Sequence, residues 1–402
     1  MNAADNAFIL VCAGLVFMMT PALALFYGGL VRSRNVLSTS MHSYACLAVG
    51  TVLWFVVGYS LAFGPDHGGL IGDFTYVFFH GVSGTQAPAA ATLPHETFAL
   101  FQCMFACLTM ALISGAYAER IRFSAMLLFS GLWLLLVYCP MAHWVWGGGW
   151  MADMGALDFA GGAVVHMASA AAALACAHAL GPRLDSGLSH EGPHNLPMTL
   201  AGCGLLWLGW FGFNAGSALA ANGLAAHAFA TTHIATAFGI CGWLCVEWKH
   251  TGKPTSLGAA SGALAGLVVI TPAAGFVSLE AAALMGFAGG LCCYGGIMLK
   301  TFFGYDDVLD VVGIHGVGGT LGALLTGVFA RAEYNGVDGL LAGHPAQLGV
   351  QAISVVATWV FVYVASRILL ALVNALIGLR VSADEEISGL DLNEHNERGY
   401  NY

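Results

Sequence analysis

Long apolar runs, separated by short stretches that hold the few charged residues, dominate this sequence. Of its 402 residues, 58% are hydrophobic and only 8% are charged, whereas about 25% of a soluble domain is charged. A membrane-spanning helix needs roughly 20 consecutive apolar residues. Eleven such runs begin near Asn6, Thr39, His95, Phe123, Gly161, Leu196, Ala226, Leu257, Val277, Val308 and Gln347. We therefore expect an all-α membrane protein with eleven transmembrane helices in residues 1–380 and a polar tail at 381–402.

The basic residues indicate how these helices are oriented. All but two of the twelve Lys and Arg residues follow an odd-numbered run; Arg331 follows an even-numbered run and Arg367 lies inside the last one. Because loops rich in Lys and Arg stay in the cytoplasm, the N-terminus is expected outside and the C-terminus in the cytoplasm. The first run has no basic flank and is too long for a cleavable signal peptide.

Two similar segments suggest that the chain is duplicated. LDFAGGAVVH starts at Leu157 and LDVVGIHGVGG starts at Leu309, so Asp158 and Asp310 are matched about 150 residues, or five runs, apart. An odd number of runs reverses the direction of the second copy. We expect an inverted repeat of helices 1–5 and 6–10, an arrangement in which transporter sites form near the bilayer midplane.

Each copy carries one intramembrane histidine. At 1.5 Å per residue, His166 lies about 12 Å from Asp158 and His315 about 7 Å from Asp310, approaching the midplane from opposite faces. A histidine at that depth is a functional hypothesis by default, although a backbone carbonyl can also satisfy one. Two neutral imidazoles can share one proton and offer nitrogen atoms to a small polar solute. Ligation of haem or a metal is the alternative, but no third ligand stands out.

Other residues are ambiguous when taken one at a time. Asp158 precedes two glycines and suits a helix cap, yet its charge near the outer mouth also favours a cation. Trp146 in HWVWGGGW fits an interfacial belt or a cation–π contact. Phe101 and Phe105 are four residues apart on one helix face, and Ser217 offers a hydroxyl. Each alone is more often part of a core than of a site.

Taken together, these residues resemble those of the ammonium transporter family (Amt/Mep/Rh). The resemblance covers Phe26 to Tyr402 and rests on FYGGLVRSRNVLS, GAYAERIRFSA, HWVWGGGW, GALDFAGGAVVH, PHNLPM, GWFGFNAGSA, GVGG after His315, and the tail GLDLNEHNERGY. The pair GALDFAGGAVVH and GWFGFNAGS is the most specific part. Trp146 and Ser217 point to the bacterial Amt branch rather than to the Rhesus branch.

The resemblance implies a homotrimer in which each protomer has its own pore. It assigns roles to eight residues: ammonium recruitment to Phe105, Trp146, Ser217 and Asp158, a stacked gate to Phe101 and Phe105, and the pore lining to His166, His315 and Trp210. It implies a multi-pass protein of the cytoplasmic (inner) membrane. Ammonium, ammonia and methylammonium are the implied substrates, without enzymatic activity, cofactor, metal or nucleic-acid partner.

The implied mechanism agrees with elementary electrostatics. Moving a cation into an apolar pore costs tens of kcal/mol in the idealised limit, far more than the roughly 0.5–2 kcal/mol of a cation–π contact. Ammonium should therefore release its proton at the mouth and cross as ammonia, and the proton either travels separately or stays behind. An ammonium sensor that signals through the tail, a Rhesus-type gas channel and a haem- or metal-dependent membrane enzyme remain alternatives.

The tail departs from the family pattern. After Glu394 and His395 the family has glycine, but this chain has Asn396. Glycine there permits a positive φ, and asparagine is the next best residue for that conformation. We expect the tail fold to be kept. The resemblance then implies regulation by a PII-type signal protein that blocks the cytoplasmic mouth.

Overall fold

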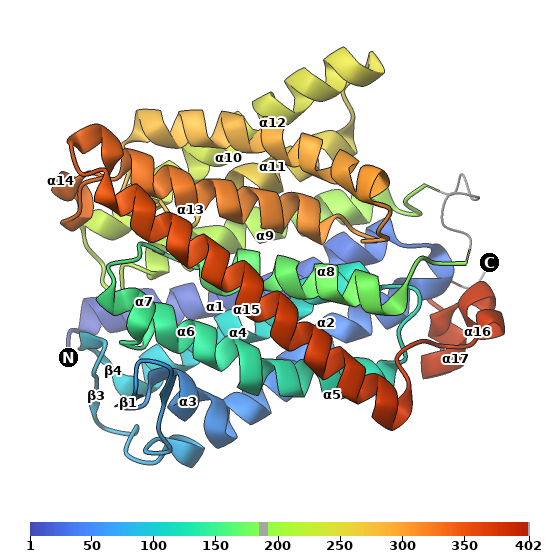
Figure 1. Ribbon diagram of the computed structural model, residues 1–402, viewed down its shortest axis with the longest axis horizontal. Coiled ribbons are helices and arrows are strands. Elements are labelled where there is room, and N and C mark those ends of the chain that lie inside the picture. Colours follow the sequence, from blue (N-terminus) through green and yellow to red (C-terminus); the bar gives the residue numbers. More distant parts are fainter. Residues whose placement is uncertain (185–191, 401–402) are drawn as a thin grey trace.

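The computed structural model describes residues 1–184 and 192–400, and it is a bundle of long helices with two short hairpins (Figure 1). Residues 401 and 402, the end of the predicted tail, lie outside the described residues. The long elements are α1 (Ala3–Leu30), α2 (Val36–Leu53) continued by η2 (Trp54–Gly58) and α3 (Tyr59–Phe63), α4 (His95–Tyr117), α5 (Phe123–Trp133) continued by η4 (Leu134–Tyr138) and α6 (Cys139–Trp146), η5 (Gly162–Met167) continued by α8 (Ala168–Leu180), α9 (Leu196–Gly216), α10 (Gly223–Thr251), α11 (Ser256–Ile270), α12 (Leu279–Phe303), η6 (Val312–Gly316) continued by α13 (Val317–Phe329), and α15 (Ala346–Ile377).

Short elements connect these helices at the two ends of the bundle. They are η1 (Ser33–Asn35), β1 (Asp66–His67), β2 (Ile71–Gly72), η3 (Val77–Phe79), β3 (Gln86–Ala87), β4 (Ala90–Pro94), α7 (Trp150–Asp153), α14 (Ala332–Asn335), η7 (Leu340–Ala342), α16 (Ala383–Ser388) and α17 (Leu390–His395). β1 pairs with β2 and β3 with β4, both antiparallel. Four of the long helices contain a π-helical turn, namely η2, η4, η5 and η6.

The predicted all-α membrane architecture is confirmed. Within residues 1–184 and 192–400, ten helices are long and apolar enough to cross a membrane. In the eighth place stands the shorter apolar helix α11, of 15 residues, so the count of eleven stays a prediction. The N-terminus and the tail helices lie at opposite ends of the bundle (Figure 1), as an odd number of crossings requires.

Close glycine contacts join the first helices of the two halves, α1 and α9. A methyl group added at Gly202 would lie 2.5 Å from the backbone nitrogen of Phe26, and one at Gly212 would lie 2.9 Å from the carbonyl oxygen of Cys12. Small residues allow this approach of two backbones inside a membrane. Residue numbers fall along α1 as they rise along α9, so the two helices are antiparallel.

The fifth helices of the two halves are paired in the same way. A methyl group at Gly319 would lie 3.1 Å from the carbonyl oxygen of Gly162, and one at Gly316 would lie 3.1 Å from the Cβ of Ala170. α8 and α13 therefore cross in opposite directions. These two antiparallel pairs are what an inverted repeat of helices 1–5 and 6–10 predicts.

The tail packs against the end of the bundle opposite the hairpins. The carboxylate of Asp391 accepts hydrogen bonds from the backbone N–H groups of Leu37 (3.1 Å) and Ser38 (2.8 Å), at the start of α2. Glu394 accepts one from the N–H of Phe123 (3.0 Å), at the start of α5. Carboxylates at helix N-termini satisfy free N–H groups and oppose the helix dipole. The predicted positive φ at Asn396 is confirmed, at 53°.

Candidate functional site

His166 and His315 meet in the interior of the bundle. Each lies in a π-helical turn, η5 or η6, and their Nδ1 atoms are 3.1 Å apart. Both side chains are buried. A π turn widens the helix by one residue and is frequent at functional sites. The predicted meeting of the two histidines is confirmed.

This Nδ1–Nδ1 contact fixes the chemistry of the pair. In a hydrogen bond between neutral imidazoles, one Nδ1 carries the proton and the other accepts it. The donor histidine then has a bare Nε2, while the acceptor histidine carries N–H at Nε2. The pair thus offers one hydrogen-bond acceptor and one donor beyond itself. Nε2 of His166 is buried and has no partner among the described residues, although a buried polar atom normally has one.

Asp158 is the cap that its sequence context predicted. Its carboxylate accepts hydrogen bonds from the backbone N–H groups of Gly161 (2.8 Å), Gly162 (2.5 Å) and Ala163 (2.7 Å). These groups begin the helix that carries His166. At Gly161 the φ of 123° suits only glycine, and it turns the chain back toward the carboxylate.

The matching of Asp158 with Asp310 in the repeat is wrong. The counterpart of Asp158 is Asp307, which stands eight residues before His315 as Asp158 stands eight before His166. Asp307 accepts a hydrogen bond from the N–H of Val312 (2.7 Å) at the start of η6, so it caps the second helix. Asp310 instead pairs with Lys300. The Leu-Asp pair is common to Asp158 and Asp310 but does not identify equivalent residues. The separation of eight residues from the histidine does identify them.

Above the histidines, four aromatic rings form a group in which three of them contact the fourth, Phe105. The ring of Phe105 is stacked on that of Phe213, with centroids 4.2 Å apart and an angle of 24°. Phe101 meets Phe105 edge-on, at 4.9 Å and 68°, so the predicted stacking of this pair is wrong. Trp146 also meets Phe105 edge-on, at 6.0 Å. Phe101 and Phe105 are four residues apart on one face of α4, and the ring parallel to Phe105 comes instead from α9.

Phe213 is the residue that the sequence analysis missed. It links the outer aromatic group to the histidines, because its ring also lies 6.1 Å from that of His166, at an angle of 27°. Trp210 stacks on His166 as well, at 5.4 Å, and donates its indole N–H to Thr271. The spacing of Trp210, Phe213 and Ser217 in GWFGFNAGSA, three and four residues, was the available signal, since it puts all three on one helix face.

Hydrogen bonds hold the outer residues in place. The indole N–H of Trp146 donates to the carbonyl of Asp158 (2.9 Å), which connects these two predicted site residues. The hydroxyl of Ser217 donates to the carbonyl of Phe213 (2.8 Å), which leaves its lone pairs available. Gln351 of α15 both accepts from the N–H and donates to the carbonyl of Leu157, so it fixes the residue before Asp158.

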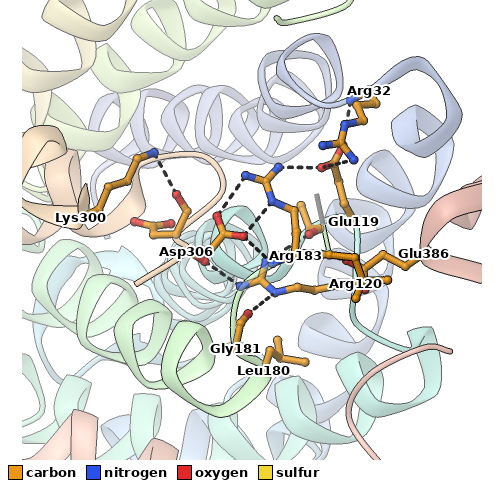
Figure 2. A network of polar contacts seen from close by, with 12 residues as sticks. Arg32, Glu119, Arg120, Leu180, Gly181, Arg183, Lys300, Asp306 and Glu386 are labelled. Carbon is orange, nitrogen blue, oxygen red and sulfur yellow. Dashed lines mark hydrogen bonds and ion pairs between the residues drawn. The ribbon is translucent and has the colours of Figure 1, made fainter. Parts of the chain in front are cut away.

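On the tail side, a cavity of about 430 Å³ leads toward the histidines. Its lining includes Arg32, Glu119 and Arg183 at the mouth and Ile314, the neighbour of His315, further in. Figure 2 shows Arg183 between Glu119 and Asp306. The Arg183 guanidinium donates to both oxygens of Asp306 (2.9 and 3.0 Å) and to Glu119 (2.7 Å).

Charge pairing stabilises this mouth. Burial alone would raise the pKa of Glu119, but the guanidinium groups of Arg183 and Arg32 lower that pKa below its ordinary value. The same balance, with Arg183 as partner, lowers the pKa of Asp306. Both carboxylates are therefore ionised at neutral pH. No group of three or more His, Cys, Asp and Glu side chains within residues 1–184 and 192–400 is arranged to hold a metal ion.

Comparison with known proteins gives consistent matches over the whole chain. The model of the Ammonium Transporter Family matches residues 7–400. An ammonium transporter of Bacillus subtilis is 50% identical over 403 residues, which covers 100% of this chain and 99% of that protein. The crystal structure of Saccharomyces cerevisiae Mep2 superposes with a TM-score of 0.90 at 38% identity, covering 96% of this chain and 88% of the other. A sensor Amt protein superposes with a TM-score of 0.91 at 27% identity, covering 98% of each chain.

Proposed function

Since this chain belongs to the ammonium transporter family, we propose that it collects ammonium at its outer aromatic group and conducts ammonia past the paired histidines. The observation that carries the proposal is the contact between His166 and His315 below the stacked rings of Phe105 and Phe213. A polar pair inside an apolar, ring-covered interior suits a small solute that both donates and accepts hydrogen bonds.

Recruitment is assigned to the aromatic rings and the hydroxyl at the outer end. Phe101 and Trp146 each meet Phe105 edge-on, so this group presents ring faces in more than one direction. Ring faces attract cations, Trp most strongly. The lone pairs of Ser217 add an acceptor for an ammonium N–H. Asp158 acts indirectly, because its carboxylate is engaged by backbone N–H groups while its carbonyl orients Trp146.

Selectivity follows from the step below this site. A cation cannot enter the apolar interior at an acceptable free energy, so ammonium must lose a proton before passing Phe105 and Phe213. Potassium has no proton to lose and is excluded. Ammonia then donates to the bare Nε2 of one histidine and accepts from the Nε2–H of the other. The released proton either crosses by way of the histidine pair or remains outside.

The test is an ammonium concentration jump on proteoliposomes that contain the purified protein, with potassium as the control ion. We expect an ammonium current and no potassium current. Replacing His166 and His315 together by leucine removes both polar groups and should reduce ammonium flux by at least about tenfold, the factor for one hydrogen bond of roughly 1.4 kcal/mol.

A matched control distinguishes the effect of losing the His166–His315 pair from the effect of replacing any histidine in the bundle. His233→Leu makes the same chemical change on α10, where the ring packs beside Trp207 and Phe211 and away from the pair. Its flux should equal that of the wild type. Unchanged flux and selectivity in the double variant would refute the role of the histidines, while an electrically silent flux of ammonia would show that the proton stays outside.

An ammonium sensor is the second candidate. The likeness to a sensor Amt protein favours it, and so do the tail carboxylates that cap α2 and α5, because they connect the bundle to a cytoplasmic segment. A sensor need not conduct. Ammonium binding without flux in the same proteoliposomes, together with a change in protease protection of the tail, would favour sensing over transport.

The proposal includes a homotrimer in the inner membrane, with the tail face covered by a PII-type signal protein when transport is stopped. The resemblance to the family supports the trimer. The open cavity with Arg32 and Glu119 at its mouth supports a plug at that face. Light scattering of the purified protein tests the assembly, and calorimetric titration with a PII-type protein tests the partner.

A further inference from the structure

Arg367 lies well inside the membrane-spanning helix α15. It stands on α15 ten residues before the helix ends at Ile377, about 15 Å along the axis. By contrast, Lys249 and Lys300 belong to the last turns of their helices. A charged side chain inside an apolar span is costly and normally has a partner.

The described residues supply no such partner. Arg120, Arg122, Arg183 and Arg380 all donate to backbone carbonyls or to carboxylates. For the guanidinium of Arg367, within residues 1–184 and 192–400, neither a hydrogen bond nor an ion pair is found. Its five N–H donors are thus left for something outside the fold.

The neighbouring side chains add a second donor. This donor is His178, an exposed residue in the last turn of α8. Nδ1 of His178 is 2.9 Å from the hydroxyl of Tyr363, which is one turn before Arg367 on α15. When the tyrosine donates this bond, Nε2 of His178 carries the proton and can donate outward.

The surroundings are those of the lipid boundary on the tail side. Val364, Ile368 and Leu372 on the same helix are 49%, 63% and 47% exposed, so this face of α15 is apolar. α15 packs against α8 and crosses it diagonally (Figure 1). The end of α8 joins the polar network of Figure 2, because the carbonyl of Leu180 accepts from Arg380. His178 is thus within one turn of the end of α8 that joins this network.

We propose that Arg367 and His178 bind the phosphate of an anionic phospholipid in the leaflet on the tail side, with its acyl chains along the apolar face of α15. A guanidinium binds phosphate oxygens through two parallel N–H bonds. The long arginine side chain reaches from the hydrocarbon toward the headgroups. The cytoplasmic leaflet is the one rich in anionic lipid, which agrees with the predicted orientation of the tail.

The experiment uses the full-length protein in phosphatidylcholine nanodiscs that contain a photoactivatable phosphatidylglycerol probe. Cross-linked sites are mapped by mass spectrometry after digestion. We expect labelling on the α8 and α15 peptides that carry His178 and Arg367. Unlabelled phosphatidylglycerol should compete with the probe, whereas phosphatidylcholine and inorganic phosphate should not.

Variants then identify the cation. Arg367→Gln should reduce labelling at this place about fivefold, the factor expected for one basic residue near an anionic leaflet, and Arg367→Lys should retain part of it. Arg331→Gln removes the same charge at the other end of the bundle and should leave the labelling unchanged.

Equal labelling of the wild type and Arg367→Gln would overturn the proposal, and so would equal competition by phosphatidylcholine. If Arg367→Gln does not fold, His178→Gln tests the second donor in the same assay, with a reduction expected. Protection of this face by a second copy of the chain, seen as protein–protein cross-links at Arg367 in place of lipid label, would also overturn it.

Discussion

Asp158 and Asp307 decide where the paired histidines stand, because each carboxylate begins the helix that carries one of them. The first cap was predictable from an aspartate before two glycines. The cap at Asp307 was not predictable, because Asp310 lies nearer to His315 and follows a leucine, as Asp158 does. A short sequence identifies a capping aspartate only when the backbone N–H groups that it accepts from are also known. Tertiary structure decides which N–H groups those are.

Asp307 should give the protein a measurable pH dependence. Burial and the charge of Asp310 raise the pKa of Asp307 to about 6. Between pH about 4 and 6 the folded protein then binds a proton that the unfolded chain has released, so stability falls as pH rises through this window. Asp307→Asn keeps an acceptor for Val312 and removes the titration. We expect lowering the pH from 7 to 5 to stabilise the wild type, but not the variant, by roughly 1.4 kcal/mol, since pH 5 lies one unit below the raised pKa. The measurement is the melting temperature, which should rise for the wild type alone.

The same measurement on Asp384→Asn provides the control, because this residue is exposed on α16. Its pH profile should follow that of the wild type. Parallel profiles for Asp307→Asn and the wild type would contradict the assignment.

Phe213 should be a determinant of selectivity. Phe213→Ala removes the ring stacked on Phe105 and beside His166, and the space left behind admits water to the histidine pair. A hydrated path lowers the barrier for whole cations, so we expect a potassium current that is absent in the wild type, with the ammonium-to-potassium ratio lowered by roughly tenfold or more. The measurement is the ion jump on proteoliposomes.

Phe211→Ala is the matched control for that variant. Phe211 lies two residues away on α9, and its ring stacks on Phe229 of α10 instead, at 4.0 Å. Selectivity should be unchanged there. Loss of potassium exclusion in both variants would indicate a general loosening of α9 and would remove the specific role of Phe213.

At the level of helices, the bundle depends on places where a glycine lets two helix backbones touch directly. Along α9, glycines face the backbone of α1. The sequence predicted the starts of the long helices to within a few residues, because length and apolarity are local properties. It did not predict the π turns at His166 and His315, because one extra residue in a helical turn leaves no periodic signal in the sequence.

Two neighbouring glycines of α9 should respond oppositely to the same substitution. Gly202→Ala places a methyl group 2.5 Å from the backbone nitrogen of Phe26, which cannot move aside, and should cost about 1–3 kcal/mol. Gly204 has nothing within 4 Å, so Gly204→Ala should be neutral or gain up to about 1 kcal/mol of helix propensity. Melting temperatures of the two purified variants test this difference. Equal values would mean that α1 and α9 are not in backbone contact.

For the molecule as a whole, the tail ties together helices that are distant in sequence. Asp391 begins α2 and Glu394 begins α5, while Arg380 closes α8 through the carbonyl of Leu180. The sequence analysis predicted the turn at Asn396 from its conformational tolerance. It could not predict which helices the carboxylates would reach, because those contacts span more than 250 residues.

Removing one of these carboxylates should release the tail. Asp391→Asn replaces a charged acceptor of two backbone N–H groups by a neutral amide and should weaken docking by roughly 1 kcal/mol. We expect limited proteolysis to cleave the tail about five times faster. Asp384→Asn makes the same change on a side chain that is exposed, and its cleavage rate should stay at the wild-type value. Equal rates for the two variants would show that the tail is held by other contacts.

α8 and α13 cross in opposite directions, and each has a capping aspartate eight residues before its histidine. This symmetry has a consequence for how a cell retains nitrogen. Viewed from either end, the centre of the proposed pore has nearly the same arrangement, so the proposed pore has no built-in direction. If the proposed conduction holds, the gradient of the transported species across the membrane, and not the pore itself, then decides the direction of flow. When the interior is rich in nitrogen, an open pore becomes a leak. The asymmetry that prevents such loss must reside at the two ends, in the aromatic group on one and the tail on the other.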